Sequence, residues 1–130
     1  MGEGPNVDYG VRRYVVLHHW GVDEPHFDFL FEMSNDAPLM TFRLAEWPLS
    51  RDQAATRLKD HRRLYLTYQG EIPGGRGRVD RVAEGEVHIT ETASGWLLQT
   101  PAGEFFALFE PQDPPYTGDQ PNWWVTTAAR

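Results

Sequence analysis

The sequence contains no cysteine. Disulfide bonds, thiolate nucleophiles and cysteine-ligated zinc are therefore excluded, and histidine and carboxylate side chains remain as the strong metal ligands. The chain also lacks an apolar run of about 18 residues and a basic amino terminus followed by an apolar segment. We therefore expect neither a membrane span nor a signal peptide, and we predict a cytoplasmic protein.

Positive charge is scarce as well. Twelve Lys and Arg residues face 19 Asp and Glu residues, which gives a formal net charge of −7 at pH 7. This deficit argues against a protein that coats a phosphate backbone regardless of sequence, because that mode of binding needs many cations. Eight of the twelve basic residues nevertheless fall between positions 51 and 81. They form either a local basic face or a solvated surface of interspersed charges.

Long amphipathic helices are missing too. Twelve glycines and ten prolines interrupt the 130 residues, and no helical pattern persists for more than about three turns. A chain of this length has room for one core only. We predict one mainly β domain over residues 13–130, with a loosely ordered lead-in at 1–12 and a proline-rich segment at 111–122.

The sharpest local pattern lies between positions 26 and 33. Phenylalanine or methionine occupies each odd position, whereas His26, Asp28 and Glu32 lie at even positions, on the opposite face of a strand. We expect the phenylalanine face to be core. Turn residues at 34–38 then lead into a strand at 39–44, which predicts a β-hairpin.

Other segments carry weaker signals. Further strands are expected near residues 14–19, 61–68, 78–82, 86–91, 96–99, 104–109 and 123–125. Ser50 and Gln53 match a capping box, in which each side chain bonds the backbone amide of the other residue. That match predicts a short helix that ends near Leu58.

Histidine and aspartate on one strand suggest a metal site. His26 and Asp28 are two residues apart, so their side chains point the same way from Cα atoms about 6 to 7 Å apart. His18 or His19, at the end of the preceding strand, can supply a third ligand. Two imidazoles and one carboxylate suit Mn²⁺, Fe²⁺ or Zn²⁺. The alternative is a hydrogen-bonded His26–Asp28 pair on the surface of the strand.

Two sequence blocks carry a family resemblance. In the first, a strand ending in histidine (14–19) precedes a His-aromatic-Asp-aromatic segment (26–32). In the second, an Asp-His pair with a tyrosine four residues after the histidine (60–65) precedes a Tyr-Gln-Gly-Glu-Ile-Pro-Gly-Gly segment (68–75). Together they cover roughly residues 13–82, and they resemble the 3′-phosphoesterase domain of bacterial DNA ligase D, above all its short stand-alone relatives.

The resemblance implies a fold and a site. The fold would be a small antiparallel β-barrel with one or two short helices. The metal ligands would be His19, His26 and Asp28, with His18 as the register alternative to His19. The ion would be Mn²⁺, with Zn²⁺ or Fe²⁺ as alternatives. His61 would contact the scissile phosphate, and Tyr65 would belong to the same site.

The implied activity is metal-dependent removal of a 3′-phosphate or 3′-ribonucleotide from DNA or RNA ends during repair. The partners would be nucleic-acid 3′ ends and DNA-repair proteins, and the protein would be a monomer. Leu30 stands where the family carries an arginine, so a guanidinium that would bind phosphate is missing there. The candidates to replace it are Arg62, Arg63, Arg76 and Arg78.

Two other hypotheses remain open. The protein could be a binding module that keeps the fold and recognises a nucleic-acid end or a repair partner without catalysis. It could also be a cupin-like Fe²⁺ oxygenase, because two histidines and one carboxylate also describe a facial triad.

Overall fold

The computed structural model describes residues 6–112 and 122–127. Its strands are β1 (Val7–Trp20), β2 (His26–Phe31), β3 (Leu39–Leu44), β4 (Gln53–His61), β5 (Gly70–Glu71), β6 (Arg78–Glu91), β7 (Trp96–Gln99), β8 (Phe106–Pro111) and β9 (Trp123–Thr127). In these two stretches of chain the only helix is a 3₁₀ helix, η1 (Arg63–Leu66). The predicted mainly β class is confirmed. No helix in the same stretches is long and apolar enough to cross a membrane.

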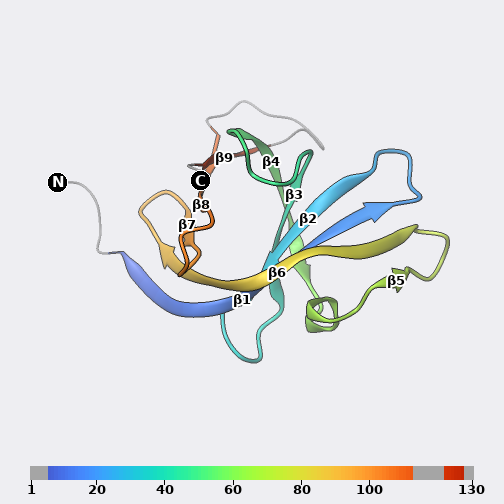
Figure 1. Ribbon diagram of the computed structural model, residues 1–130, viewed down its shortest axis with the longest axis horizontal. Coiled ribbons are helices and arrows are strands. Elements are labelled where there is room, and N and C mark those ends of the chain that lie inside the picture. Colours follow the sequence, from blue (N-terminus) through green and yellow to red (C-terminus); the bar gives the residue numbers. More distant parts are fainter. Residues whose placement is uncertain (1–5, 113–121, 128–130) are drawn as a thin grey trace.

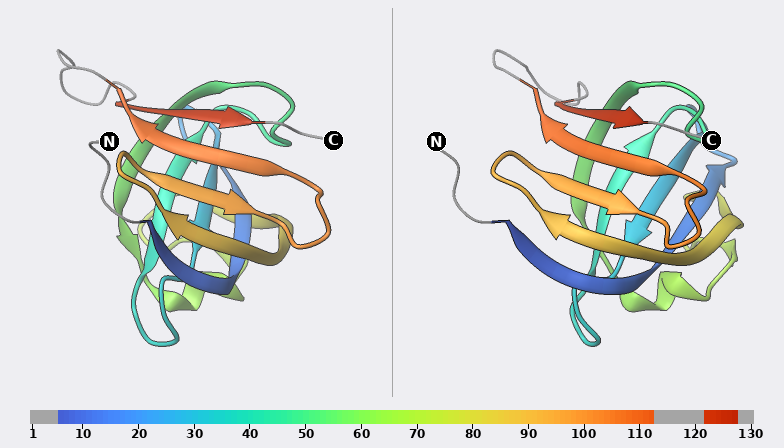
Figure 2. Two further views of the ribbon diagram at one scale, coloured as in Figure 1. Left: turned by 90° about the vertical axis from the view of Figure 1, so that its left-hand side faces the viewer. Right: turned by 60° about the vertical axis from the view of Figure 1, so that its left-hand side comes forward.

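The strands form a closed barrel (Figures 1 and 2). Neighbouring strands pair antiparallel in the order β1-β2-β3-β4-β9-β8-β7-β6, and β6 pairs with β1 to close the ring. The short β5 pairs with β6 outside this ring. The antiparallel β-barrel expected from the sequence is therefore confirmed. In Figure 1 the end of β1, the start of β2, the short β5 and the start of β6 lie together on the right, away from β7, β8 and β9.

Two hydrophobic clusters lie on the two faces of the barrel wall. The inner cluster contains the phenylalanine face of β2, as predicted, and is joined by aromatic residues such as Phe42 and Phe109. The outer cluster lies between β1, β2 and η1, and consists of Val15, Leu17, Leu30, Leu39, Leu66 and Val79. Both faces of β2 are therefore buried, and η1 covers the outer one.

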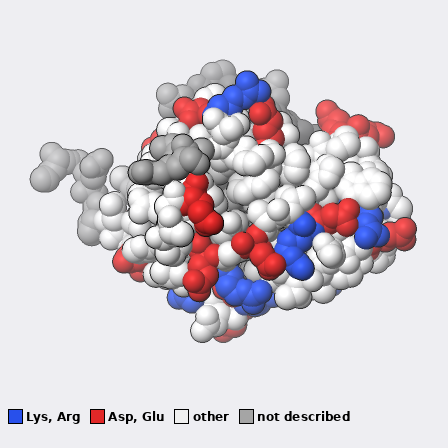
Figure 3. Space-filling view, in the orientation of Figure 1, with Lys and Arg blue, Asp and Glu red and all other residues white. Residues whose placement is uncertain are grey.

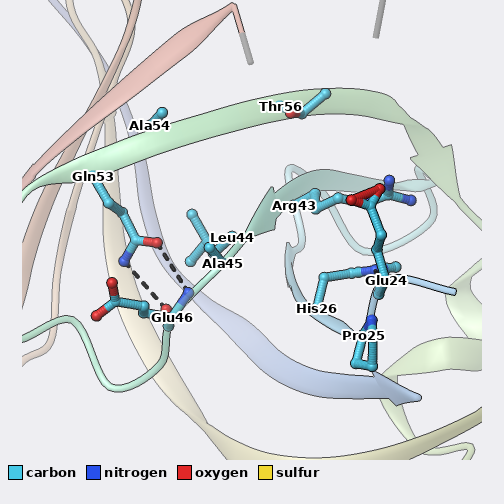
Figure 4. Close-up of a pocket in the computed structure, with 10 residues that line it drawn as sticks. All are labelled: Glu24, Pro25, His26, Arg43, Leu44, Ala45, Glu46, Gln53, Ala54 and Thr56. Carbon is cyan, nitrogen blue, oxygen red and sulfur yellow. Dashed lines mark hydrogen bonds between the residues drawn. The ribbon is translucent and has the colours of Figure 1, made fainter. Parts of the chain in front are cut away.

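The predicted capping box is wrong, because Gln53 starts strand β4 instead of a helix. Its side chain accepts from the Glu46 backbone amide at 3.1 Å and donates to the Glu46 carbonyl at 3.2 Å (Figure 4). Ala55 packs into the inner cluster, and β4 pairs with both β3 and β9. These long-range contacts override the local helix signal. The strand expected at 61–68 is also wrong, since β4 ends at His61 and η1 follows.

Other boundaries also differ from expectation. Strand β1 begins at Val7, so residues 7–12 are not a loose lead-in but pair with β6. The two strands expected at 78–82 and 86–91 are one strand, β6, which follows β1 through a register shift after Val16. The predicted last strand at 123–125 is confirmed as β9. Most of the proline-rich segment, 113–121, lies outside the described residues.

Candidate metal centre

The end of β1 and the start of β2 bring three potential ligands together. His19 and His26 are paired in the β1–β2 register, and Asp28 lies two residues further along β2 on the same face. Ligand atoms of these three residues all lie within 4.8 Å of one another. His18 lies on the opposite face of β1, where its ring stacks on Phe27 with centroids 4.8 Å apart. The structure therefore brings His19, and not His18, to the site.

Backbone carbonyls orient both imidazoles. His26 Nδ1 lies 2.9 Å from the Glu24 carbonyl oxygen, and His19 Nε2 lies 2.7 Å from the Arg76 carbonyl oxygen. Because a carbonyl can only accept, each ring must donate its N–H there. The opposite nitrogens, His19 Nδ1 and His26 Nε2, are 3.2 Å apart. In the neutral rings both of these nitrogens carry a lone pair. Histidines that bind metals commonly donate their other N–H to a backbone carbonyl, which fixes the tautomer in this way.

Asp28 adds a third acceptor to the same point. Its Oδ1 lies 3.3 Å from His26 Nε2, and its Oδ2 lies 3.9 Å from His19 Nδ1. The side chain is 5% exposed, and Oδ1 is buried without a hydrogen-bond partner. Buried acceptors without a donor are costly and rare, and a bound cation would offset this cost at Asp28. The two nitrogens and one carboxylate suit Mn²⁺, Fe²⁺ or Zn²⁺.

A cavity of about 370 Å³ opens beside the three ligands, and we call it the η1 cavity. Besides His19 and Asp28, its lining includes Lys59, Asp60, His61, Arg62, Tyr65 and Arg76. The two sequence blocks that carry the family resemblance therefore meet in space. The rings of His61 and Tyr65 lie 5.8 Å apart, and His61 Nδ1 donates to the Lys59 carbonyl oxygen at 3.1 Å. His61 Nε2 has no partner within residues 6–112 and 122–127.

Two of the four predicted substrate-binding arginines lie elsewhere. Arg63 binds the Glu32 carboxylate and donates to the carbonyls of Ser34 and Ala37 at 3.2 and 3.0 Å. The Arg78 Nε donates to Asp80 at 3.1 Å, and Arg78 lines a separate hollow. Neither residue lines the η1 cavity, because each guanidinium is held by an acidic partner.

The Glu32–Arg63 pair anchors η1 to the β2–β3 hairpin. Burial by itself would raise the pKa of Glu32, but hydrogen bonds from Arg63 and from the Arg13 backbone amide outweigh it and hold that pKa below its ordinary value. Glu32 is thus ionised when it binds Arg63. Since Arg63 lies between His61 and Tyr65 in the chain, the pair also fixes the segment that lines the cavity.

Five of the eleven basic residues in the described part of the chain pair with an acidic neighbour. The ion pairs are Arg51–Glu46, Arg57–Asp60, Arg63–Glu32, Arg78–Asp80 and Arg81–Glu84. On the face seen in Figure 3, basic side chains lie among acidic ones, which matches the interspersed-charge alternative. In the described part of the chain, Lys59, Arg62 and Arg76 make no ion pair, and all three line the η1 cavity. Arg12, Arg13 and Arg43 make no ion pair with a described residue either, so three of these six cations line the η1 cavity.

Leu30 and Arg43 each have a place in the structure that the sequence does not predict. Leu30 has no exposed surface and belongs to the outer cluster, so it is a core residue. Arg43 was not predicted as a site residue, yet it is the β3 partner of Asp28 and leaves the same face of the sheet. The sequence predicts the hairpin of β2 and β3, but Arg43 can be placed opposite Asp28 only when the register of the two strands is known.

The chain matches no family model, and no curated protein is significantly similar to it. The resemblance to the ligase D phosphoesterases therefore stays a prediction.

Proposed function

We propose that the protein is a metal-dependent phosphoesterase that acts on the 3′ ends of nucleic acids. One observation carries this proposal: the ligand atoms of His19, His26 and Asp28 converge within 4.8 Å, Asp28 Oδ1 is buried without a hydrogen bond, and the group adjoins a cavity lined by cations that make no ion pair with a described residue. A cation site beside an anion site suits a substrate whose negative charge must be held and offset during reaction. A phosphate ester has this property.

The ligand roles follow from the donor set. His19, His26 and Asp28 would hold the ion, which we expect to be Mn²⁺, with Zn²⁺ or Fe²⁺ as alternatives. When bound, such an ion offsets charge at phosphorus and lowers the pKa of a coordinated water. The Glu24 and Arg76 carbonyls keep both imidazoles in the tautomer that presents a lone pair.

Other residues would act on the phosphate directly. Lys59, Arg62 and Arg76 would bind its non-bridging oxygens through charge-assisted hydrogen bonds. Hydrolysis adds a hydroxyl to phosphorus and a proton to the leaving oxygen, and His61, in the form that carries a proton on both ring nitrogens, would supply that proton from Nε2. Its bond to the Lys59 carbonyl holds the ring for this role. The Tyr65 hydroxyl would donate to the same phosphate.

The direct test is to incubate the protein with Mn²⁺ and a primer that ends in a ribonucleotide or a 3′-phosphate, and to follow product length. His26→Ala and His61→Ala should each lower turnover by at least about 100-fold. His88→Ala is the matched control, because His88 is paired with Asp8 at 2.6 Å, outside the site.

Other results would point elsewhere. A wild-type protein that binds 3′ ends without turning them over would favour the binding module. Oxygen-dependent turnover of 2-oxoglutarate would favour the oxygenase. The cytoplasmic location, the monomeric state and the DNA-repair partners remain predictions.

A further inference from the structure

The candidate ligands lie between two hollows, one of which is the η1 cavity. The second has a volume of about 400 Å³ and lies against the start of β2 and the facing parts of β3 and β4 (Figure 4). His26 and Arg43 both line it. Since His19 and Asp28 line the η1 cavity, the ligand triad separates the two spaces. We call the second space the Arg43 hollow.

Arg43 is the basic residue nearest in register to the ligands. It pairs with Asp28 on β2 and with Thr56 on β4, so all three side chains leave the outer face of the sheet. Directly opposed side chains on antiparallel strands have Cβ atoms about 4.5 to 5.5 Å apart. Arg43 is therefore an immediate neighbour of a candidate metal ligand, on the side away from η1.

The Arg43 guanidinium is also uncommitted. It is exposed, and within residues 6–112 and 122–127 it makes no hydrogen bond or ion pair. Of the two acidic residues that line the hollow, Glu46 is bound by Arg51, and Glu24 makes no ion pair with any described residue. A guanidinium with five free donors next to the ligands can bind an anionic oxygen.

We propose that Arg43 binds the phosphate that precedes the scissile one in a nucleic-acid strand. This inference rests on the proposed function and narrows its substrate to a 3′-terminal group that is joined to the strand through a phosphodiester. The terminal group would lie in the η1 cavity, and the rest of the strand would lie in the Arg43 hollow. A phosphomonoester alone would occupy only one of the two spaces. Arg43 is then a specificity-determining residue for the length of the anionic substrate.

The first experiment measures binding without turnover. A single-stranded DNA with a 3′-terminal ribonucleotide is titrated in EDTA at several salt concentrations against the wild type, Arg43→Ala and Arg43→Lys. Arg43→Ala should lower the slope of log affinity against log salt by about 0.7, the value for one phosphate contact on a single strand, and Arg43→Lys should keep the slope. Arg81→Ala is the control, because Arg81 is already paired with Glu84.

The second experiment measures KM with Mn²⁺ for the same oligonucleotide and for methyl p-nitrophenyl phosphate, a diester without a second phosphate. Arg43→Ala should raise KM about tenfold for the oligonucleotide only. Equal losses on both substrates would overturn the inference, as would an unchanged salt slope. If the wild type hydrolyses neither substrate but the slope falls in Arg43→Ala, the phosphate contact stands and the proposed enzymatic function fails.

Discussion

Replacing Asp28 with asparagine should change stability in opposite directions with and without a divalent ion. Asp28 Oδ1 is buried without a hydrogen bond and lies 3.3 Å from His26 Nε2, the ring nitrogen that carries the lone pair. The asparagine amide can donate to that nitrogen. The free energy of unfolding of the ion-free protein should therefore rise by about 1 kcal/mol, the net value of one typical hydrogen bond.

With a divalent ion bound, the wild type should instead be more stable than Asp28→Asn. At a concentration 100 times its Kd, a bound ion raises the free energy of unfolding by about 2.7 kcal/mol. For 130 residues with ordinary unfolding entropy, that is an increase in Tm of about 10 °C. Asparagine lacks the negative charge of Asp28, and if the affinity falls 100-fold, the gain at the same concentration shrinks to about 0.4 kcal/mol.

Thermal unfolding followed by circular dichroism, in EDTA and in a series of Mn²⁺ concentrations, measures both effects. Asp8→Asn is the matched control, because Asp8 also contacts a histidine, His88, but its side chain is 65% exposed. Asp8→Asn should show the same Mn²⁺-dependent rise in Tm as the wild type. The reasoning is refuted if Asp28→Asn keeps a Mn²⁺-dependent rise of about 10 °C, or if it lowers the stability of the ion-free protein.

Three further predictions concern the surroundings of the site. The folded pKa of Glu32 is lowered, so its contribution is complete above the ordinary value of 4.5 and is lost as the pH falls through the folded value. Glu32→Gln should therefore cost about 2 kcal/mol at pH 7 and flatten the loss of stability below pH 4.5 in urea unfolding. Gly77 has φ +84°, and an added Cβ would lie 2.4 Å from the Trp20 carbonyl oxygen. Gly77→Ala should thus shift the adjoining Arg76 carbonyl that orients His19 and weaken Mn²⁺ binding in calorimetry by about tenfold or more. Gly103→Ala should not, because Gly103 has a similar φ of +75° but has open space around its Cβ and lies outside the site. Leu30→Arg should lower the free energy of unfolding by at least about 3 kcal/mol and fail to increase activity, because it places an unpaired charge in the outer cluster.

The parts of the fold that depend on local alternation could be predicted from the sequence. The period-two pattern from Phe27 to Met33 identified both the strand and its core face, since alternation follows directly from strand geometry. The three ligands could be grouped for a related reason, because a single hairpin brings them together. The prediction of a helix after Ser50 is wrong. A capping box stabilises a helix less than pairing with two strands and burial of Ala55 stabilise β4.

The assignment of individual arginines could not be predicted. Arg62 and Arg63 are adjacent in sequence, yet one lines the η1 cavity and the other binds Glu32, far along the chain. The difference depends on the direction of the 3₁₀ turn and on a partner that the local sequence does not reveal. Arg43 was missed because its role depends on strand register, which a one-residue slip would reverse.

The placement of the ligands has a consequence for the order of folding. His19 and His26 are 7 residues apart and belong to one hairpin, whereas the Arg76 carbonyl that orients His19 is 57 residues away. Short loops close at a lower entropic cost than long ones, so the hairpin should form before β6 pairs with β1 to close the barrel. We therefore expect the ligand cluster to assemble early with a freely rotating His19, and to become rigid only when the last seam of the barrel closes.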